Sequence, residues 1–156
     1  MIKQAIIPLA GLGTRLLPLT SVFAKELLPI NGKPGIEYIL DECIDAGIKE
    51  VIFIISQKKI MIKKYFNNDN FYKKIIKKKR DPRIIQEYKK ILKYKKMIKF
   101  VYQNKPKGTG DAVLKTKKFI KSKFFLMLLP DDLIIKHNCS KSMIKVHKRF
   151  NSGVMA

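Results

Sequence analysis

Two short apolar runs flank one amphipathic segment near the start of the chain. The first run covers Gln4 to Leu9, and the second covers Val51 to Ile55 and reads VIFII. Continuous runs rich in β-branched residues are typical of strands buried on both faces of a parallel sheet. Between the runs, apolar residues recur every three or four positions over 36–44, which predicts a helix, and Gly47 is suited to end it. A strand, a helix and a strand with short connections form a βαβ unit, so this region predicts an α/β fold.

The same alternation continues to the end of the chain, and one doubly wound domain over residues 1–156 accounts for it. The stretch 58–96 is rich in lysine and predicts two or three basic helices, with turns at 67–70 and 80–82. The remaining predicted elements are a strand at 97–103, a helix at 110–120, a fully buried strand at 124–129 and a helix at 140–150.

The charge of the chain raises the question of an anionic partner. Lysine and arginine number 34 against 12 acidic residues, which gives a net charge of +22. Such a surplus of positive charge favours nucleic acid or an anionic membrane as a binding partner. Arginine, whose planar fork suits phosphates and base edges, is nonetheless rare. We therefore interpret most lysines as a solvated surface, and a nucleic-acid-binding module at 58–107 remains the alternative. The arginines are Arg15, Arg80, Arg83 and Arg149.

The remaining composition points to a protein of the reducing cytoplasm. Cys43 and Cys139 lack the spacing of a metal site or of a disulfide framework. No secretory signal is recognisable, and no apolar run approaches the length of a membrane span. We expect a cytoplasmic protein without a membrane partner.

The first predicted strand ends in the glycine turn AGLGTR, residues 10–15. Gly11 and Gly13 remove side chains that would hold a phosphate away from the backbone N–H groups, and Arg15 would add a charged fork. The pattern is not a P-loop, and it lacks the third glycine of GxGxxG because Leu16 stands there. The turn therefore indicates either a phosphate site or a glycine required by backbone geometry.

Two further segments carry polar residues that suit a nucleotide. Lys25 and Glu26 on their own are typical of an exposed ion pair, and the alternative is a second cation facing phosphate. Gln103 ends the strand predicted at 97–103 and precedes Gly108. Its amide offers both a donor and an acceptor, which matches a nucleobase edge, although a loop glutamine beside a capping glycine fits equally well.

The strand predicted at 124–129 is followed by Asp131 and Asp132. A carboxylate held at a strand end suits Mg²⁺, which binds one or two carboxylates together with substrate phosphates. The alternative is a pair that caps a turn. His137 and His147 have no partnering serine or cysteine motif, so a nucleophilic triad is not indicated.

Taken in order, these motifs resemble the sugar-1-phosphate nucleotidyltransferase family, and among its members the uridylyltransferases. The resemblance runs from Gln4 to the last residues and rests on the ordered set of motifs. The motifs are AGLGTR at 10–15, KELLP at 25–29, KPGIEYILDECIDAGI at 33–48, QNKPKGTGDAV at 103–113 and LLPDD at 128–132.

The resemblance implies a Rossmann-like nucleotidyltransferase fold with a mixed, mainly parallel sheet flanked by helices. It also implies that UTP and glucose 1-phosphate give UDP-glucose and pyrophosphate with Mg²⁺ as cofactor. The residues carried over are Ala10, Gly11 and Gly13 for the nucleotide, Arg15 and Lys25 for the triphosphate, Glu26, Gln103 and Gly108 for the uracil, and Asp131 for the metal.

Three departures from the family pattern bear on these expectations. Ala24 stands where the uridylyltransferases usually have proline, and Asp111 stands where they usually have histidine. Asp111 leaves the identity of the base undecided, because thymidylyl, cytidylyl and adenylyl relatives share the glycine pattern, although KELLP favours uridylyl over thymidylyl transfer. Family members are also considerably longer. We expect an amino-terminal portion without the sugar-binding part, weak UTP binding, poor turnover, and a homo-oligomer in the full-length enzyme.

Overall fold

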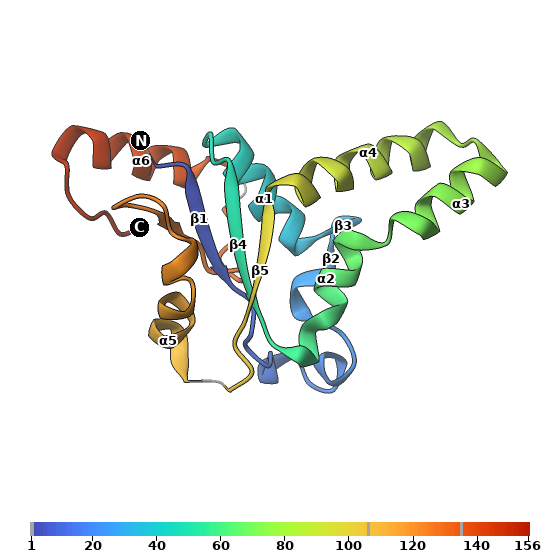
Figure 1. Cartoon of the computed structure of the whole chain (residues 1–156), viewed down its shortest axis with the longest axis horizontal. Coiled ribbons are helices and arrows are strands. Elements are labelled where there is room, and N and C mark those ends of the chain that lie inside the picture. Colours follow the sequence, from blue (N-terminus) through green and yellow to red (C-terminus); the bar gives the residue numbers. More distant parts are fainter. Residues whose placement is uncertain (1, 106, 135) are drawn as a thin grey trace.

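The computed structural model describes residues 2–105, 107–134 and 136–156. Its centre is a parallel sheet of four strands in the order β5-β4-β1-β6 (Figure 1). The predicted α/β fold with a mainly parallel sheet is confirmed. The strands are β1 (Gln4–Pro8), β4 (Glu50–Ile55), β5 (Ile98–Tyr102) and β6 (Leu126–Met127).

The two predicted strands of the βαβ unit lie side by side at the centre of the sheet. Ile6 of β1 pairs with Ile52 of β4, and Ile52 pairs with Lys99 of β5. Every residue from Val51 to Ile55 has no exposed surface. Val51, Phe53 and Ile55 belong to the larger apolar cluster on one face, and Ile52 and Ile54 to the smaller cluster on the other. Burial on both faces explains why the sequence is continuously apolar here.

Helices cover both faces of the sheet, and three of them form the lysine-rich region. Residues of α1, α2, α4 and α6 join the larger apolar cluster, whereas Ala112 of α5 joins the smaller one. The helices α3 and α4 extend away from the sheet as a hairpin (Figure 1). The bounds are α1 (Gly35–Asp45), α2 (Ile60–Asn67), α3 (Asp69–Lys79), α4 (Pro82–Met97), α5 (Gly108–Lys115) and α6 (Cys139–Phe150).

Two predicted elements differ from the observed ones. The strand expected at 124–129 as fully buried is only the two residues of β6, and Met127 is 40% exposed. Within the described residues β6 pairs only with β1, so it forms an edge of the sheet. The helix expected at 110–120 ends at Lys115, where Thr116 turns its hydroxyl onto the carbonyl of Val113 at 2.6 Å, and a short 3₁₀ turn follows.

A small hairpin precedes α1 and was not predicted. Strands β2 (Pro29–Ile30) and β3 (Lys33–Pro34) pair antiparallel around Asn31 and Gly32, both of which have positive φ. An Asn-Gly pair between two extended segments is a strong hairpin signal, so the sequence did contain this information. Within the described ranges, no helix has the length and apolar character needed to cross a membrane.

Candidate nucleotide-binding site

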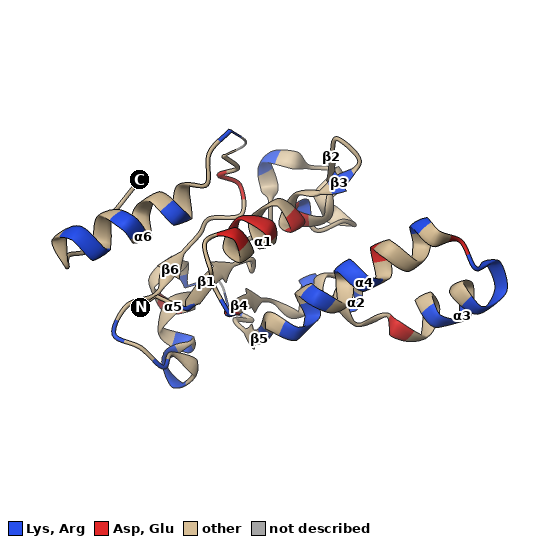
Figure 2. Cartoon of the chain, turned by 90° about the horizontal axis from the view of Figure 1, so that it is seen from above, with Lys and Arg blue, Asp and Glu red and all other residues tan. Residues whose placement is uncertain are grey.

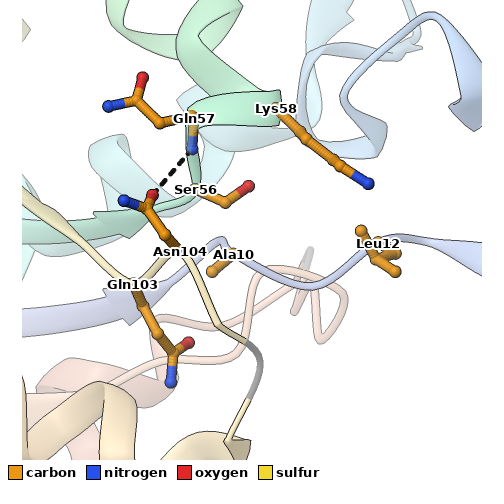
Figure 3. A pocket seen from close by; sticks show the side chains of 7 residues that line it. All are labelled: Ala10, Leu12, Ser56, Gln57, Lys58, Gln103 and Asn104. Atoms are coloured by element: carbon orange, nitrogen blue, oxygen red, sulfur yellow. Dashed lines mark hydrogen bonds between the residues drawn. The ribbon is translucent and has the colours of Figure 1, made fainter.

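The loops that follow β1, β4 and β5 meet beyond the carboxyl ends of these strands, and we call this side of the sheet its carboxyl edge. They enclose a pocket of about 390 Å³ (Figure 3). In an open parallel sheet, ligands bind beyond the carboxyl ends of the strands, and the pocket lies at this position. Of the predicted site residues, Ala10 and Gln103 contribute to its wall. The lining residues are Ala10, Leu12, Ser56, Gln57, Lys58, Gln103 and Asn104.

The two glycines of the turn have different roles. Gly13 has φ of 71°, and a Cβ there would lie 3.1 Å from Cγ2 of Thr20, so the backbone itself requires glycine. The Thr20 hydroxyl donates to the Gly13 carbonyl at 2.8 Å and holds the turn. A Cβ at Gly11 would meet nothing within 4 Å. Gly11 therefore leaves the backbone open to an approaching group, while Gly13 serves the shape of the turn.

Arg15, Lys25 and Asp131 come together beside the glycine turn. The Lys25 ammonium lies 3.0 Å from a carboxylate oxygen of Asp131. The pKa of Asp131 is lowered mainly by the hydrogen bond from Lys25, and the charges of Lys25 and Arg15 add to this effect. Arg15 is exposed on the short 3₁₀ turn Thr14–Leu16. Asp131 is thus held as an anion among cations from two other segments.

Glu26 forms a buried ion pair with Lys59. The Lys59 ammonium donates to both carboxylate oxygens of Glu26, at 2.6 and 2.8 Å. The two residues are only 3% and 6% exposed, so the interpretation of Glu26 as part of an exposed Lys-Glu pair is wrong. Burial lowers the pKa of Lys59, and Glu26 acts in the opposite direction. The charges of Lys25 and Asp131 also act on Lys59, so the two ion pairs belong to one charged cluster.

Gln103 and Gly108 are in direct contact. Gln103 is 5% exposed, and its backbone N–H donates to the carbonyl of Ile55 at 2.9 Å. The side-chain nitrogen donates to the Gly108 carbonyl at 3.1 Å and to a carboxylate oxygen of Asp111 at 2.7 Å. Gly108 has φ of 87° where α5 begins. The glutamine is therefore a buried, oriented group and not a free loop side chain.

Sequence reasoning missed the residues that follow β4. The hydroxyl of Ser56 is buried in the pocket wall and has no hydrogen-bond partner in the described part of the chain. The backbone N–H of Gln57 donates to the side chain of Asn104 at 3.3 Å, which connects the loops after β4 and β5 (Figure 3). Because strand ends of a parallel sheet share one edge, the strand predicted at Val51 to Ile55 already pointed to these positions. Nothing in the lysine-rich sequence distinguishes Lys59 from its neighbours.

The residues present are compatible with a magnesium ion only if a substrate completes its coordination. Across residues 2–105, 107–134 and 136–156 no group of three or more metal-binding side chains occurs. Asp131 is a single anionic carboxylate whose side chain is 54% exposed. Mg²⁺ is commonly bound by one or two carboxylates with the oxygens of substrate phosphates, and a lone exposed carboxylate fits that mode.

The fold places the chain among the α/β proteins with a parallel sheet flanked by helices. The family model described as nucleotidyl transferase matches residues 4–156. The chain therefore belongs to the nucleotidyl transferase family.

Similar proteins include several uridylyltransferases. The UTP–glucose-1-phosphate uridylyltransferase of Mycoplasma pneumoniae is 42% identical over 133 residues, which are 85% of this chain and 45% of that protein. The enzyme of the same name from Bacillus subtilis is 37% identical over 133 residues, with the same 85% and 45% coverage. The chain spans about half the length of the curated relatives it matches.

Solved structures show the same fold. The UTP-bound UGPase from Acinetobacter baumannii superposes with a TM-score of 0.89 at 31% identity, over 97% of this chain and 54% of that one. A UDP-glucose pyrophosphorylase complexed with UDP-glucose gives a TM-score of 0.78 at 29% identity, over 97% and 55%.

Proposed function

We propose that residues 1–156 form the nucleotide-binding portion of a UTP–glucose-1-phosphate uridylyltransferase. In this reaction a phosphate oxygen of glucose 1-phosphate attacks the α-phosphorus of UTP, pyrophosphate leaves and UDP-glucose forms. The observation that carries the proposal is the convergence of the glycine turn, Lys25, Gln103 and Asp131 on one sheet edge. The relatives named for this reaction, and the UTP-bound structure of the same fold, support it.

The chemistry fits the side chains at this edge. The attacking phosphate oxygen is already anionic, so the site needs no general base and must instead align the reactants and neutralise charge. Arg15 and Lys25 would hold the triphosphate, and the backbone at Ala10, Gly11 and Gly13 would contact the nucleotide. Gln103 and Gly108 would read the base.

Asp131 would hold Mg²⁺. When bound, the ion would neutralise the phosphates and the departing pyrophosphate. The anionic state of Asp131 under the influence of Lys25 and Arg15 suits this role.

Glu26 would act on the nucleotide site through Lys59. Both carboxylate oxygens of Glu26 already accept from Lys59, and neither residue belongs to the pocket wall. We propose that this pair fixes the segment that carries Lys25, while direct contact with uracil falls to Gln103 and Gly108.

The binding of glucose 1-phosphate and the transfer of the uridylyl group are proposed for the whole enzyme, because the chain spans about half the length of its relatives. We propose that this chain binds UTP and that the whole enzyme is a homo-oligomer of the cytoplasm. Thymidylyl or cytidylyl transfer is the alternative within the family.

The proposal predicts that UTP with Mg²⁺ raises the midpoint of thermal unfolding of this chain, since a ligand bound only by the native state stabilises it. Arg15→Ala should remove most of the shift, because the bidentate hydrogen bonds from the guanidinium to a phosphate are lost. Arg149→Ala is the matched control, since Arg149 is an exposed arginine on α6, and it should keep the shift. No shift in the parent protein, or equal shifts in the two variants, would contradict the proposal.

A further inference from the structure

The side-chain amide of Gln103 is held in one orientation by two groups that can only accept hydrogen bonds. Its nitrogen donates to the Gly108 carbonyl at 3.1 Å and to an Asp111 carboxylate oxygen at 2.7 Å. A backbone carbonyl and a carboxylate oxygen cannot donate, so the amide nitrogen, and not the amide oxygen, must face them. Both N–H groups of Gln103 are thereby used within the protein.

The oxygen of the same amide is left as the group that Gln103 can offer to a ligand. No residue in the described part of the chain donates a hydrogen bond to Oε1 of Gln103, whereas Gln103 itself belongs to the pocket wall. In Figure 3 the Gln103 side chain extends away from the other labelled lining side chains, with the amide nitrogen at its far end and the amide oxygen to one side. A ligand bound beside Gln103 would therefore meet an acceptor from this side chain, since both of its N–H groups are already used.

Pyrimidine bases differ at N3 of their pairing edge, and an acceptor placed opposite N3 binds some of them better than others. Uracil and thymine carry a donor at N3, whereas cytosine carries an acceptor there. An acceptor from Gln103 satisfies N3–H of uracil, but it faces a lone pair of cytosine and leaves both groups unpaired. Leaving polar groups unpaired in a buried site costs more than forming the bond gains, so the arrangement rejects cytosine.

We infer that Asp111 is a specificity-determining residue, which sets the preference for uracil over cytosine by locking the Gln103 amide with its oxygen toward the base. This inference rests on the proposed binding of UTP and deepens it. Asp111 acts through Gln103 and is a positioning residue. Its carboxylate lies in the first turn of α5, and Lys115 is 3.9 Å away on the next turn. An acidic residue in a first turn also stabilises a helix, so the test must separate specificity from stability.

The decisive variant is Asp111→Asn, which keeps the shape of the side chain but can present either an oxygen or an N–H group to Gln103. Only the Gly108 carbonyl then still holds the amide nitrogen, so the amide turns over more readily, and CTP gains a donor from Gln103 when it does. We expect the ratio of the CTP to the UTP dissociation constant to fall by about tenfold, the value of one net hydrogen bond. Asp45→Asn, at the exposed end of α1, makes the same change of charge away from the pocket and should keep the ratio.

A second measurement varies the ligand and leaves the protein intact. The triphosphate of N3-methyluridine lacks the N3–H group, so the parent protein should bind it at least about tenfold more weakly than UTP.

The outcomes separate the two proposals. If the parent protein does not bind UTP, the proposed function fails. If it prefers UTP to CTP but Asp111→Asn keeps that ratio, or if the N3-methyl nucleotide binds as well as UTP, the role of Asp111 is overturned while the proposed function stands.

Discussion

Two regions of the molecule place lysine in different surroundings. One is the edge proposed to bind the nucleotide, called the nucleotide edge, which holds the Lys25–Asp131 and Lys59–Glu26 pairs. The other is the basic arm, defined as residues 60–97 of α2, α3 and α4. At the nucleotide edge, Lys25 and Lys59 each contact one carboxylate, and Lys59 is almost completely buried. The basic arm holds fourteen lysines and arginines against three acidic residues. In the described structure only Arg83, Lys90 and Lys95 of these fourteen form ion pairs.

Figure 2 shows the cations of the basic arm spread along the exposed α3 and α4 hairpin. The hairpin is held by packing, with the rings of Tyr72 and Tyr88 stacked at 5.1 Å, and Tyr94 of α4 donates to Asp41 of α1 at 2.6 Å. The number of lysines in a segment therefore says little about its function. Lys59 differs from the lysines of the basic arm because it is almost completely buried against a single carboxylate.

The largest predicted effect concerns the buried pair at the nucleotide edge. Glu26→Gln should lower the free energy of unfolding by about 3–5 kcal/mol, because it leaves the Lys59 ammonium buried without its counterion. Arg83→Gln breaks an exposed pair of the basic arm and should have no measurable effect. Urea unfolding of both variants measures the difference. Similar values for the two would contradict the distinction between the regions.

A smaller effect is expected from the Lys25 and Asp131 contact, and it depends on pH. The pKa of Asp131 is lowered in the folded state by Lys25, so the contact stabilises the fold when the carboxyl is ionised. This contribution is present above the unfolded pKa of about 3.9 and is lost as the pH falls below it. The difference in unfolding free energy between the parent protein and Asp131→Asn should therefore be small at neutral pH and vanish in acid. If the difference between the parent protein and Asp131→Asn grew as the pH fell, the prediction would be contradicted.

The smallest effect is expected in the basic arm. Replacement of Lys77, Lys78 and Lys79 by glutamine removes three exposed cations from the end of α3 and should leave the UTP-induced thermal shift unchanged. The same variant tests the alternative of a nucleic-acid-binding module. If the parent protein binds duplex DNA with a steep dependence on salt, and the triple variant has a shallower dependence, the basic arm has a function of its own.

The sequence predicted the parts of the fold that depend on local patterns. The apolar runs at β1 and β4, the amphipathic α1 and the basic helices are all present, because each pattern is repeated within one element. The prediction of a fully buried strand at 124–129 was wrong, because the neighbours of a strand in the sheet decide whether it is a central or an edge strand. The hairpin at Asn31 and Gly32 was missed although its signal was in the sequence.

Local patterns in the sequence specify a βαβ unit, a glycine turn at the end of the first strand and an ordered set of polar residues at strand ends. The partners of these residues, in contrast, follow from the packing of the fold. Lys25 meets Asp131, and Glu26 meets Lys59, because the parallel register brings loops far apart in the chain to one edge. Asp111 likewise meets Gln103 across the turn that leads into α5, and its proposed role depends on this contact. Side-chain contacts of this kind depend on how strands and helices pack together, and no local pattern in the sequence encodes them.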